Sequence, residues 1–144
     1  MVYHYIQSYE YDGQSLFEIM NTFTRQTRLF KALAHPVRLS ILEILRDGEQ
    51  CVCHMEAVLG FRQAYISQHL MVLREAGLVE DRRDGWNVFY RVVKPQVYGV
   101  MGAAAGLLGV ALEDTRLHKP LACPCPKCNP APAAIIPAEQ VNSN

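Results

Sequence analysis

The 144-residue sequence lacks a net charge, because 14 lysine and arginine residues balance 14 acidic residues. It also lacks an amino-terminal basic stretch followed by an apolar run, the pattern of a secretory signal peptide. The uncharged stretch 96–112 has 17 residues and includes several glycines, which is short of the ~20 that comfortably span a bilayer. We therefore expect a cytoplasmic protein without a membrane partner. We favour a buried helix over a membrane anchor with a face at Gly102 and Gly106.

The charges are distributed unevenly along the chain. Residues 25–94 carry eleven basic and eight acidic side chains, a difference of +3. Three acidic and no basic residues precede this segment, and three of each follow it. A basic excess of this size is compatible with nucleic-acid binding only if the positive charge is placed locally.

Four helices are predicted in the first half of the chain. Ser15 and Glu18 form a potential capping box for the first, which should end near His35 because Pro36 restricts the residue before it. Pro36 suits the first turn of the second helix. The second helix is predicted to run from Pro36 to a stop at Gly48. The third and fourth are predicted at residues 53–59 and 63–76, stopped by Gly60 and Gly77.

The pattern then changes to that of strands. Segments 78–82 and 87–93 have strand-like character and flank Asp84-Gly85, a strong hairpin signal. A last helix is predicted from Pro95 to about Leu117. Two short helices joined by a tight turn and followed by a hairpin indicate a winged helix-turn-helix, a mainly α fold with a small β-hairpin.

Three segments follow from this assignment. We expect a flexible arm at residues 1–14 and a DNA-binding and dimerisation domain at residues 15–119. A proline- and alanine-rich tail should follow at residues 120–144.

Five cysteines form two clusters, Cys51 with Cys53 and Cys123 with Cys125 and Cys128. In a reducing compartment, clustered thiols favour metal binding or redox sensing over structural disulfides. Cys51 and Cys53 can converge if Cys51 is extended at a helix start, where the helix dipole should also lower the thiol pKa. The tail cysteines either bind an ion themselves or add thiolates to Cys51 and Cys53, within one subunit or across two.

A family resemblance rests on four motifs. They are Leu-Phe-Lys-Ala-Leu-Ala-His-Pro-Val-Arg-Leu at 29–39, Cys-Val-Cys at 51–53, Ile-Ser-Gln-His-Leu-Met-Val-Leu-Arg-Glu-Ala-Gly-Leu-Val at 66–79 and Tyr-Arg-Val at 90–92. Together they closely resemble the ArsR/SmtB family of bacterial metal- and metalloid-responsive repressors. The resemblance implies a homodimer, formed through the first and last helices, that binds operator DNA and releases it when thiolates capture an inducer. We expect the operator to be an imperfect palindrome.

In the resembling family, a Cys-Val-Cys at this helix start typifies sites for arsenite, antimonite, cadmium and lead. This chain differs in having His54 where an acid is common, which leaves His54 open as a ligand. It also has no further cysteine in the third helix. The motif therefore supplies two thiols, whereas a trivalent metalloid prefers three. We expect the tail cysteines to supply the missing thiol. As(III) and Sb(III) are the favoured inducers, with Cd(II), Pb(II) and Zn(II) as further candidates. A second metal site on the last helix is not evident, because Glu113, Asp114 and His118 lack partners.

The fourth helix is the predicted reading helix. Ile66, Leu70 and Leu73 form its buried stripe, and Gln68 on the opposite face is suited to a bidentate contact with adenine. His69, at the flank of the stripe, is expected to make a structural hydrogen bond. The predicted DNA-contacting residues are Gln63, Ala64, Tyr65, Ser67 and Gln68 on this helix and Arg82 and Arg83 on the wing.

Two other functions compete with a metalloid-released repressor. A repressor of the same fold could sense oxidants or persulfide through cysteines of low pKa. A redox enzyme using Cys125 and Cys128 is disfavoured, because such a pair expects a βαβ context and this one lies on a proline-rich tail. We therefore do not expect an enzyme.

Overall fold

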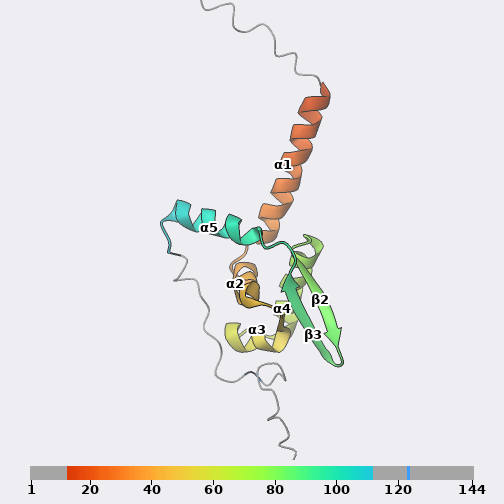
Figure 1. Ribbon diagram of the computed structural model, residues 1–144, viewed down its shortest axis with the longest axis vertical. Helices are drawn as coiled ribbons and strands as arrows, with labels where there is room; N and C mark the ends of the chain where they lie inside the picture. The colour runs from red at the N-terminus through yellow and green to blue at the C-terminus, as the bar shows by residue number, and fades with distance from the viewer. Residues whose placement is uncertain (1–12, 112–122, 124–144) are drawn as a thin grey trace, which may run out of the picture.

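Helix α1 (Gly13–Leu33) projects from one end of the computed structural model, which describes residues 13–111 and Cys123 (Figure 1). The chain is already helical at Gly13, so Ser15 and Glu18 lie inside the helix and do not form the predicted capping box. Along its length, the side chains of Phe17, Phe23 and Phe30 are more than half exposed. The helix therefore carries apolar surface that the rest of the described chain does not cover.

The second helix, α2 (Pro36–Ile44), begins at the predicted proline. His35 caps it, because its Nδ1 atom accepts a hydrogen bond from the Val37 amide at 3.2 Å. A single 3₁₀ turn, η1 (Leu45–Asp47), continues the helix as far as Gly48. Gly48 has φ of +133°, a conformation that favours glycine, and this explains why the helix stops there.

Helices α3 (Val52–Leu59) and α4 (Gln63–Glu75) form the helix-turn-helix. The turn between them begins at Gly60, which adopts the left-handed conformation with φ of +71°. The structure thus confirms the predicted positions of these helices to within one residue. The helices are held by a shared core whose most deeply buried side chains are Ile41, Leu42, Met55, Ile66, Leu70, Leu73 and Val79.

The hairpin is a wing of two strands, β2 (Val79–Asp84) and β3 (Asn87–Val92). Asp84 faces Asn87 across the turn, as the Asp84-Gly85 signal predicts. A third strand, β1 (Gln50–Cys51), was not predicted and adds to β3, giving the antiparallel order β1-β3-β2. The register of β1 places Cys51 opposite Phe89. The segment that carries the first cysteine is therefore part of the same sheet as the wing.

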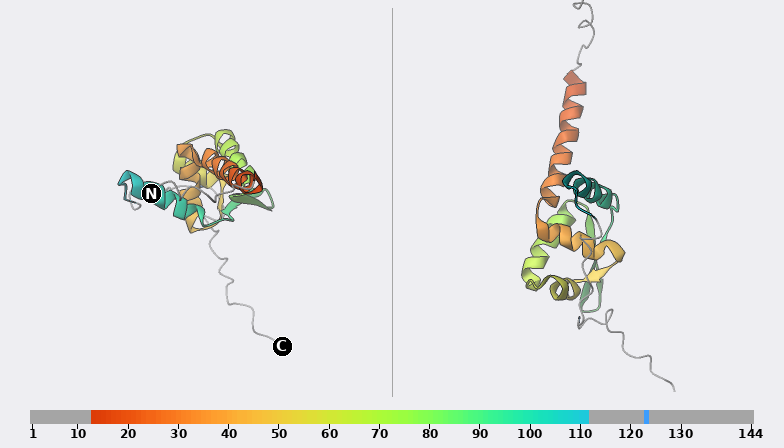
Figure 2. Two further views of the ribbon diagram at one scale, coloured as in Figure 1. Left: turned by 90° about the horizontal axis from the view of Figure 1, so that it is seen from above. Right: turned by 90° about the vertical axis from the view of Figure 1, so that its left-hand side faces the viewer.

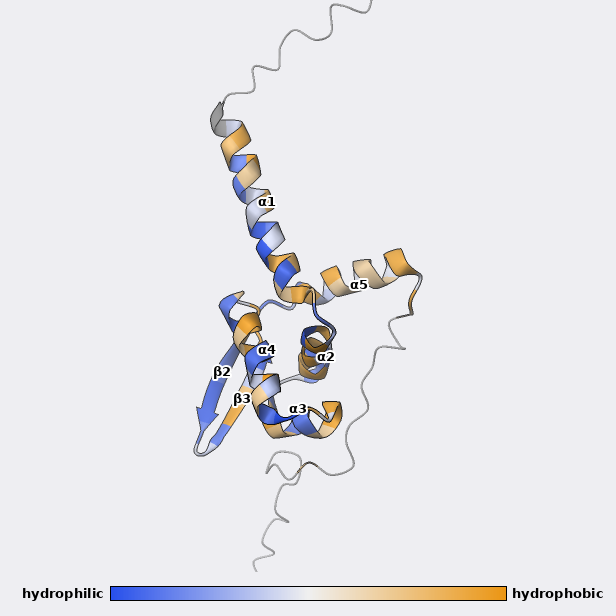
Figure 3. Ribbon diagram, turned by 180° about the vertical axis from the view of Figure 1, so that it is seen from behind, coloured by the Kyte–Doolittle hydropathy of each residue, from blue (hydrophilic) through white to orange (hydrophobic). Residues whose placement is uncertain are grey.

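The last described helix, α5 (Val97–Leu108), is shorter than predicted. It ends because Gly109 turns into the left-handed conformation, with φ of +67°. The remainder of the predicted helix, residues 112–117, lies outside the described residues. Leu107 and Leu108 are largely exposed, and Figure 3 shows α5 as an almost uniformly apolar helix. Among the described residues, no helix is long and apolar enough to cross a membrane.

The two ends of the molecule differ in character. Figures 1 and 2 place α1 at one end and α3 with the tip of the wing at the other. Helix α5 leaves the body near the base of α1 (Figure 2). The uncovered apolar side chains of α1 and the apolar helix α5 are thus separated from the wing tip.

Candidate nucleic-acid interface and metal centre

The amino-terminal half of α4 presents a polar face to solvent. The structure places all five helix residues predicted to contact DNA on this face, each of them exposed: Gln63, Ala64, Tyr65, Ser67 and Gln68. Ile66, Leu70 and Leu73 are buried on the other side, which confirms the predicted stripe. Because α2 and α3 pack behind α4, its polar face is held rigidly outward. Such a helix fits the major groove.

His69 is buried on the flank of α4, but not with the expected hydrogen bond. Its Nε2 atom has no hydrogen-bond partner among the described residues. The ring instead packs against two others, with centroids 4.3 Å from His35 and 4.6 Å from Tyr65. Burial, with the nearby His35 and Arg38, lowers the pKa of His69. The prediction of a structural hydrogen bond was wrong for this atom, because ring packing occupies the site.

The wing carries the two predicted arginines, and they differ in environment. Both are exposed, but Arg83 makes no ion pair with any described residue, whereas Arg82 is bound by Glu49. At the tip, Trp86 is fully exposed and lies beside Gly85, whose φ of +59° forms the turn. An indole left entirely in water at the end of a wing is available for contact with a sugar or a groove wall. Sequence reasoning missed Trp86, although its position after Gly85 was a usable signal.

The wing is anchored to α4 at its base. Arg74 near the end of α4 forms an ion pair with Asp81 of β2, with 2.8 Å between Nη1 and Oδ1. The Arg74 guanidinium lowers the pKa of Asp81 mainly through this hydrogen bond. The reading helix and the wing are therefore connected by a polar contact as well as by the core.

Three cysteines meet at the start of α3. The Sγ atoms of Cys51, Cys53 and Cys123 all lie within 4.8 Å of one another, and those of Cys53 and Cys123 are 4.0 Å apart. Cys51 and Cys123 are each only 3% exposed. Among the described residues this is the one cluster of three or more potential metal ligands, and the His54 side chain is not part of it. The thiol trio, as we call Cys51, Cys53 and Cys123, thus joins the predicted motif to the tail within one chain.

The trio is built on the cap of α3. Cys51 has extended backbone and is the N-cap, and its Sγ accepts a hydrogen bond from the His54 amide at 3.4 Å. This geometry matches the convergence predicted for a helix start. The predicted lowering of the thiol pKa does not hold for Cys53, whose pKa is raised by burial first and then by the neighbouring Cys51 and Cys123. Burial and the proximity of the other two thiols thus account for the direction of the shift.

Two residues that sequence reasoning missed complete the surroundings. Phe89 of β3 is buried against Cys51 and Cys123, and it is the strand partner of Cys51. Glu49 precedes β1 and binds Arg82 through both carboxylate oxygens. Neither was detectable before β1 was known, since the strand that brings them together is two residues long. Cys125 and Cys128, also predicted as ligands, lie outside the described residues.

Comparison with known proteins identifies the protein family. The family profile described as "Bacterial regulatory protein, arsR family" matches residues 35–81, which contain α2, β1, α3, α4 and the start of β2. The chain is 38% identical over 108 residues to the arsenic resistance transcriptional regulator of Pseudomonas putida, covering 66% of this chain and 84% of that one. It is 48% identical over 66 residues to the biofilm growth-associated repressor of Agrobacterium fabrum. That match covers 46% of this chain and spans little more than half, 56%, of the relative.

Solved structures agree with the sequence relatives. The crystal structure of NolR from Sinorhizobium fredii superimposes with a TM-score of 0.59 at 32% identity, covering 65% of this chain and 94% of that one. A homodimeric winged helix-turn-helix DNA-binding domain from Mycobacterium bovis gives a TM-score of 0.55 at 30% identity, covering 60% and 83%. The fold is therefore the winged helix-turn-helix that the resemblance implied, and the relatives are transcriptional regulators rather than enzymes. The chain belongs to the ArsR family of bacterial DNA-binding transcriptional repressors.

Proposed function

We propose that this repressor binds an operator as a homodimer and is released when the thiol trio captures a trivalent metalloid, with arsenite and antimonite preferred. The observation that carries the proposal is the convergence of three sulfur atoms within 4.8 Å, two of them on buried residues. A trivalent metalloid prefers three sulfur ligands, and the Cys-Val-Cys motif alone supplies two. Cys123 provides the third from 70 residues away.

The chemistry of the site favours a metalloid over a divalent cation. Arsenious acid, As(OH)₃, and three thiols are all neutral, and their reaction forms three As–S bonds while three hydroxide groups leave as water with the thiol protons. The product is neutral, so that no charge is placed in the buried site. Three thiolates on Cd(II), Pb(II) or Zn(II) would leave one net negative charge there, which burial disfavours. We therefore rank these cations after As(III) and Sb(III).

Capture would act on the helix-turn-helix through the cap of α3. Cys51 Sγ now accepts the His54 amide hydrogen bond that caps α3, and a bond from sulfur to an ion competes for the same lone pairs. Since α3 packs directly against α4, a shift at its first turn is transmitted to the reading face. An ion that binds the released state only ~1.4 kcal/mol more tightly than the DNA-binding state lowers operator affinity tenfold.

A dimer accounts for the uncovered apolar surface. A groove of about 630 Å³ runs between the end of α1, α2 and α5, lined largely by apolar side chains that include Phe30, Leu39, Met101 and Leu108. Gly99 and Gly106 of α5 have open space where a Cβ atom would lie, so that a second helix can approach closely. We propose that a second copy of the chain covers this groove and α1. Two reading helices then face half-sites about one DNA turn apart.

The proposal is tested by operator-binding titrations with As(III), Sb(III), Cd(II), Pb(II) and Zn(II) in parallel, followed by fluorescence anisotropy. We expect As(III) and Sb(III) to release the operator at the lowest concentrations, with one ion bound per subunit and the thiols intact. Cys53→Ser and Cys123→Ser should each keep operator binding and lose release. A Cys125→Ser/Cys128→Ser variant is the matched control and should behave as wild type. Release of the Cys51→Ser/Cys53→Ser variant at wild-type concentrations would place the sensor elsewhere.

A thiol redox sensor is the second candidate, favoured by one distance. Cys53 and Cys123 have their sulfur atoms 4.0 Å apart, so a modest approach would allow a disulfide bond of about 2.05 Å. An oxidant that accepts two electrons and two protons from the two thiols would then be the inducer. Mass spectrometry of the released protein distinguishes the candidates, because disulfide formation lowers the mass by two hydrogens and blocks alkylation of both cysteines.

A further inference from the structure

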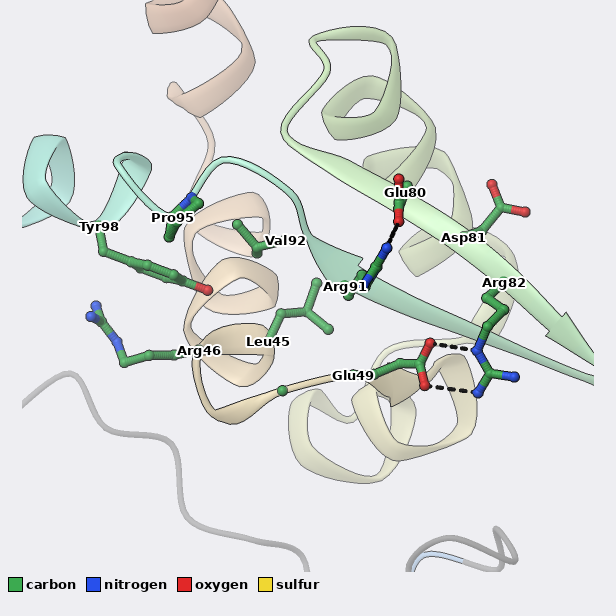
Figure 4. A pocket seen from close by; sticks show the side chains of 11 residues that line it. Leu45, Arg46, Glu49, Glu80, Asp81, Arg82, Arg91, Val92, Pro95 and Tyr98 are labelled. Atoms are coloured by element: carbon green, nitrogen blue, oxygen red, sulfur yellow. Dashed lines mark hydrogen bonds and ion pairs between the residues drawn. The ribbon is translucent and has the colours of Figure 1, made fainter.

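Arg82 is held by an acidic residue from the segment that carries the first cysteine. Its Nε and Nη2 atoms bind the two carboxylate oxygens of Glu49 at 2.9 and 2.8 Å, a bidentate geometry (Figure 4). A second, longer contact of 3.4 Å reaches Asp84 near the wing tip. The guanidinium carbon also lies 5.3 Å from the centre of the Phe89 ring. Hydrogen bonding to Glu49 raises the pKa of Arg82, in keeping with a firmly held cation.

Two of the partners of Arg82 connect it to the thiol trio, Phe89 by packing and Glu49 along the chain. Glu49 immediately precedes β1, whose second residue is Cys51. Phe89 is the strand partner of Cys51 on one side and of Arg82 on the other, and its ring packs against Cys51 and Cys123. A movement of Cys51 therefore reaches Arg82 by two short routes, through Glu49 and through Phe89.

Closing the trio around one ion limits how far apart its sulfur atoms can stand. Sulfur atoms bound to a common ion at ~2.3 Å stand at most ~4 Å apart in a three-fold arrangement. The sulfur atoms of the free trio lie within 4.8 Å, so any pair beyond about 4 Å must approach. Cys51 belongs to β1, so an approach made by Cys51 displaces this strand or strains the pairing with Phe89.

The Glu49–Arg82 ion pair differs from the other ion pair of the wing. Glu80 and Arg91 form another cross-strand ion pair on the same wing, with Nε of Arg91 2.6 Å from Glu80 (Figure 4). Both of its residues belong to the hairpin, so this pair makes no connection to β1. Of these two ion pairs, only Glu49–Arg82 joins the wing to the segment that leads into β1 and Cys51.

We propose that Glu49 is a positioning residue that couples the thiol trio to the wing: its ion pair with Arg82 fixes the wing arginine in the ion-free state and shifts it when Cys51 is ligated. The wing then contributes to operator release together with the α3 cap. This inference rests on the proposed function, since it requires an inducer at the trio. It extends that function by assigning part of the coupling to a residue that touches neither ion nor DNA.

The test measures the arsenite-induced change in operator Kd, the ratio of Kd with and without saturating arsenite, on full-length protein. We expect Glu49→Gln to bind arsenite as wild type does and to reduce this ratio at least about threefold, whatever its own ion-free affinity for the operator. Glu80→Gln, which removes the other wing ion pair, should leave the ratio unchanged. Thermal unfolding of each variant establishes that it is folded, and Glu49→Asp serves as a conservative second variant that should restore part of the ratio.

A double-mutant cycle with Arg82→Gln separates coupling from a general structural effect. If the ion pair is the route, Glu49→Gln has no further effect on the ratio once Arg82 is replaced. An undiminished effect of Glu49→Gln in the Arg82→Gln background, or a wild-type ratio for Glu49→Gln, would overturn the inference. Failure of arsenite to release the wild-type protein would instead overturn the proposed function.

Discussion

Gln68 is the exposed residue on α4 whose side chain is best suited to reading a base. Its amide can donate to and accept from adenine at the same time, and Ile66 and Leu70 hold the helix so that this side chain faces outward. Gln63 and Ser67 on the same face are better suited to phosphate or to a single hydrogen bond. We therefore expect operator specificity to depend on Gln68 more than on its neighbours.

We expect Gln68→Ala to weaken operator binding by ~1–3 kcal/mol, because one bidentate base contact is lost. Binding to scrambled duplex, and the salt dependence of binding, should change little, since no phosphate contact is removed. Fluorescence anisotropy on operator and scrambled DNA at fixed salt measures both. Gln26→Ala, which removes an exposed glutamine on α1, is the control. Unchanged operator affinity for Gln68→Ala would remove this residue from the readout.

His69 makes the stability of the fold depend on pH. Its pKa is lowered in the folded protein by burial first and by His35 and Arg38 second, so the unfolded chain binds the proton more readily. As the pH falls through the unfolded value of about 6.5, the folded state therefore loses stability relative to the unfolded state. Above that pH, the imidazole is neutral in both states and the effect vanishes.

We expect His69→Phe, which keeps an aromatic ring against His35 and Tyr65, to flatten the decline in unfolding free energy below pH 6.5. The reduction can reach at most ~1.4 kcal/mol per pH unit, the slope of one proton. Urea unfolding of wild type and variant between pH 5 and 8, about the range over which histidine titrates, measures it. Parallel pH profiles for the two proteins would assign the titration to another group.

At the scale of elements, the spacing of apolar residues and the positions of turn residues predicted α2, α3, α4 and the hairpin. Each of these elements is long enough to show its pattern. β1 could not be predicted in this way. It has two residues, and its partner β3 lies about 40 positions further along the chain, so that only tertiary pairing defines it. The residues that depend on β1, Glu49 and Phe89, were missed for the same reason.

The opposite error occurred at the last helix. Uncharged residues continue past Leu108 to Leu112, and the predicted helix extended to about Leu117, whereas α5 ends at Leu108. Gly109 ends the helix in the left-handed conformation, but it was one of several glycines in the segment and gave no distinct stop signal. The convergence of Cys123 on Cys51 and Cys53 was one of several alternatives from sequence, since the path of a proline-rich tail leaves no periodic signal.

We expect the two arginines of the wing to contribute differently to DNA binding. Arg83 makes no ion pair with any described residue and is free to follow the DNA backbone, whereas Arg82 is engaged by Glu49. We expect Arg83→Ala to reduce the slope of log K against log salt by ~0.9, the value for one phosphate contact, and Arg82→Ala to reduce it by less. Anisotropy titrations between about 50 and 200 mM salt measure both slopes. An equal or larger reduction for Arg82→Ala would show that DNA displaces Glu49 from its partner.

At the scale of the whole molecule, the apolar and polar surfaces lie on different parts of the chain. The reading face and the trio are carried by the helix-turn-helix and its sheet, whereas α1 carries the largest group of uncovered apolar side chains and α5 ends in the exposed Leu107 and Leu108. A single copy would leave the groove and both helices in water, which promotes association. Pairing through α1 and α5 leaves the reading face of each copy free.

The dimer is tested at Gly106, where the chain itself leaves room for a side chain. A Cβ atom there meets nothing within 4 Å, so the side chain of Gly106→Leu starts in open space within the subunit, and we expect its effect on assembly to come from a neighbouring copy. Because the leucine would keep the two helices apart, we expect the wild type to sediment as a dimer at micromolar concentration and Gly106→Leu to sediment as monomer or aggregate. A monomeric form should also bind the operator far more weakly, since each copy then contacts one half-site alone.

Ala57→Leu, which adds the same apolar bulk at an exposed position of α3, controls for general hydrophobicity and should remain dimeric. A wild type that sediments as a monomer, or a Gly106→Leu protein that stays dimeric with full operator affinity, would exclude α5 from the interface and require the two reading helices to be paired through another surface.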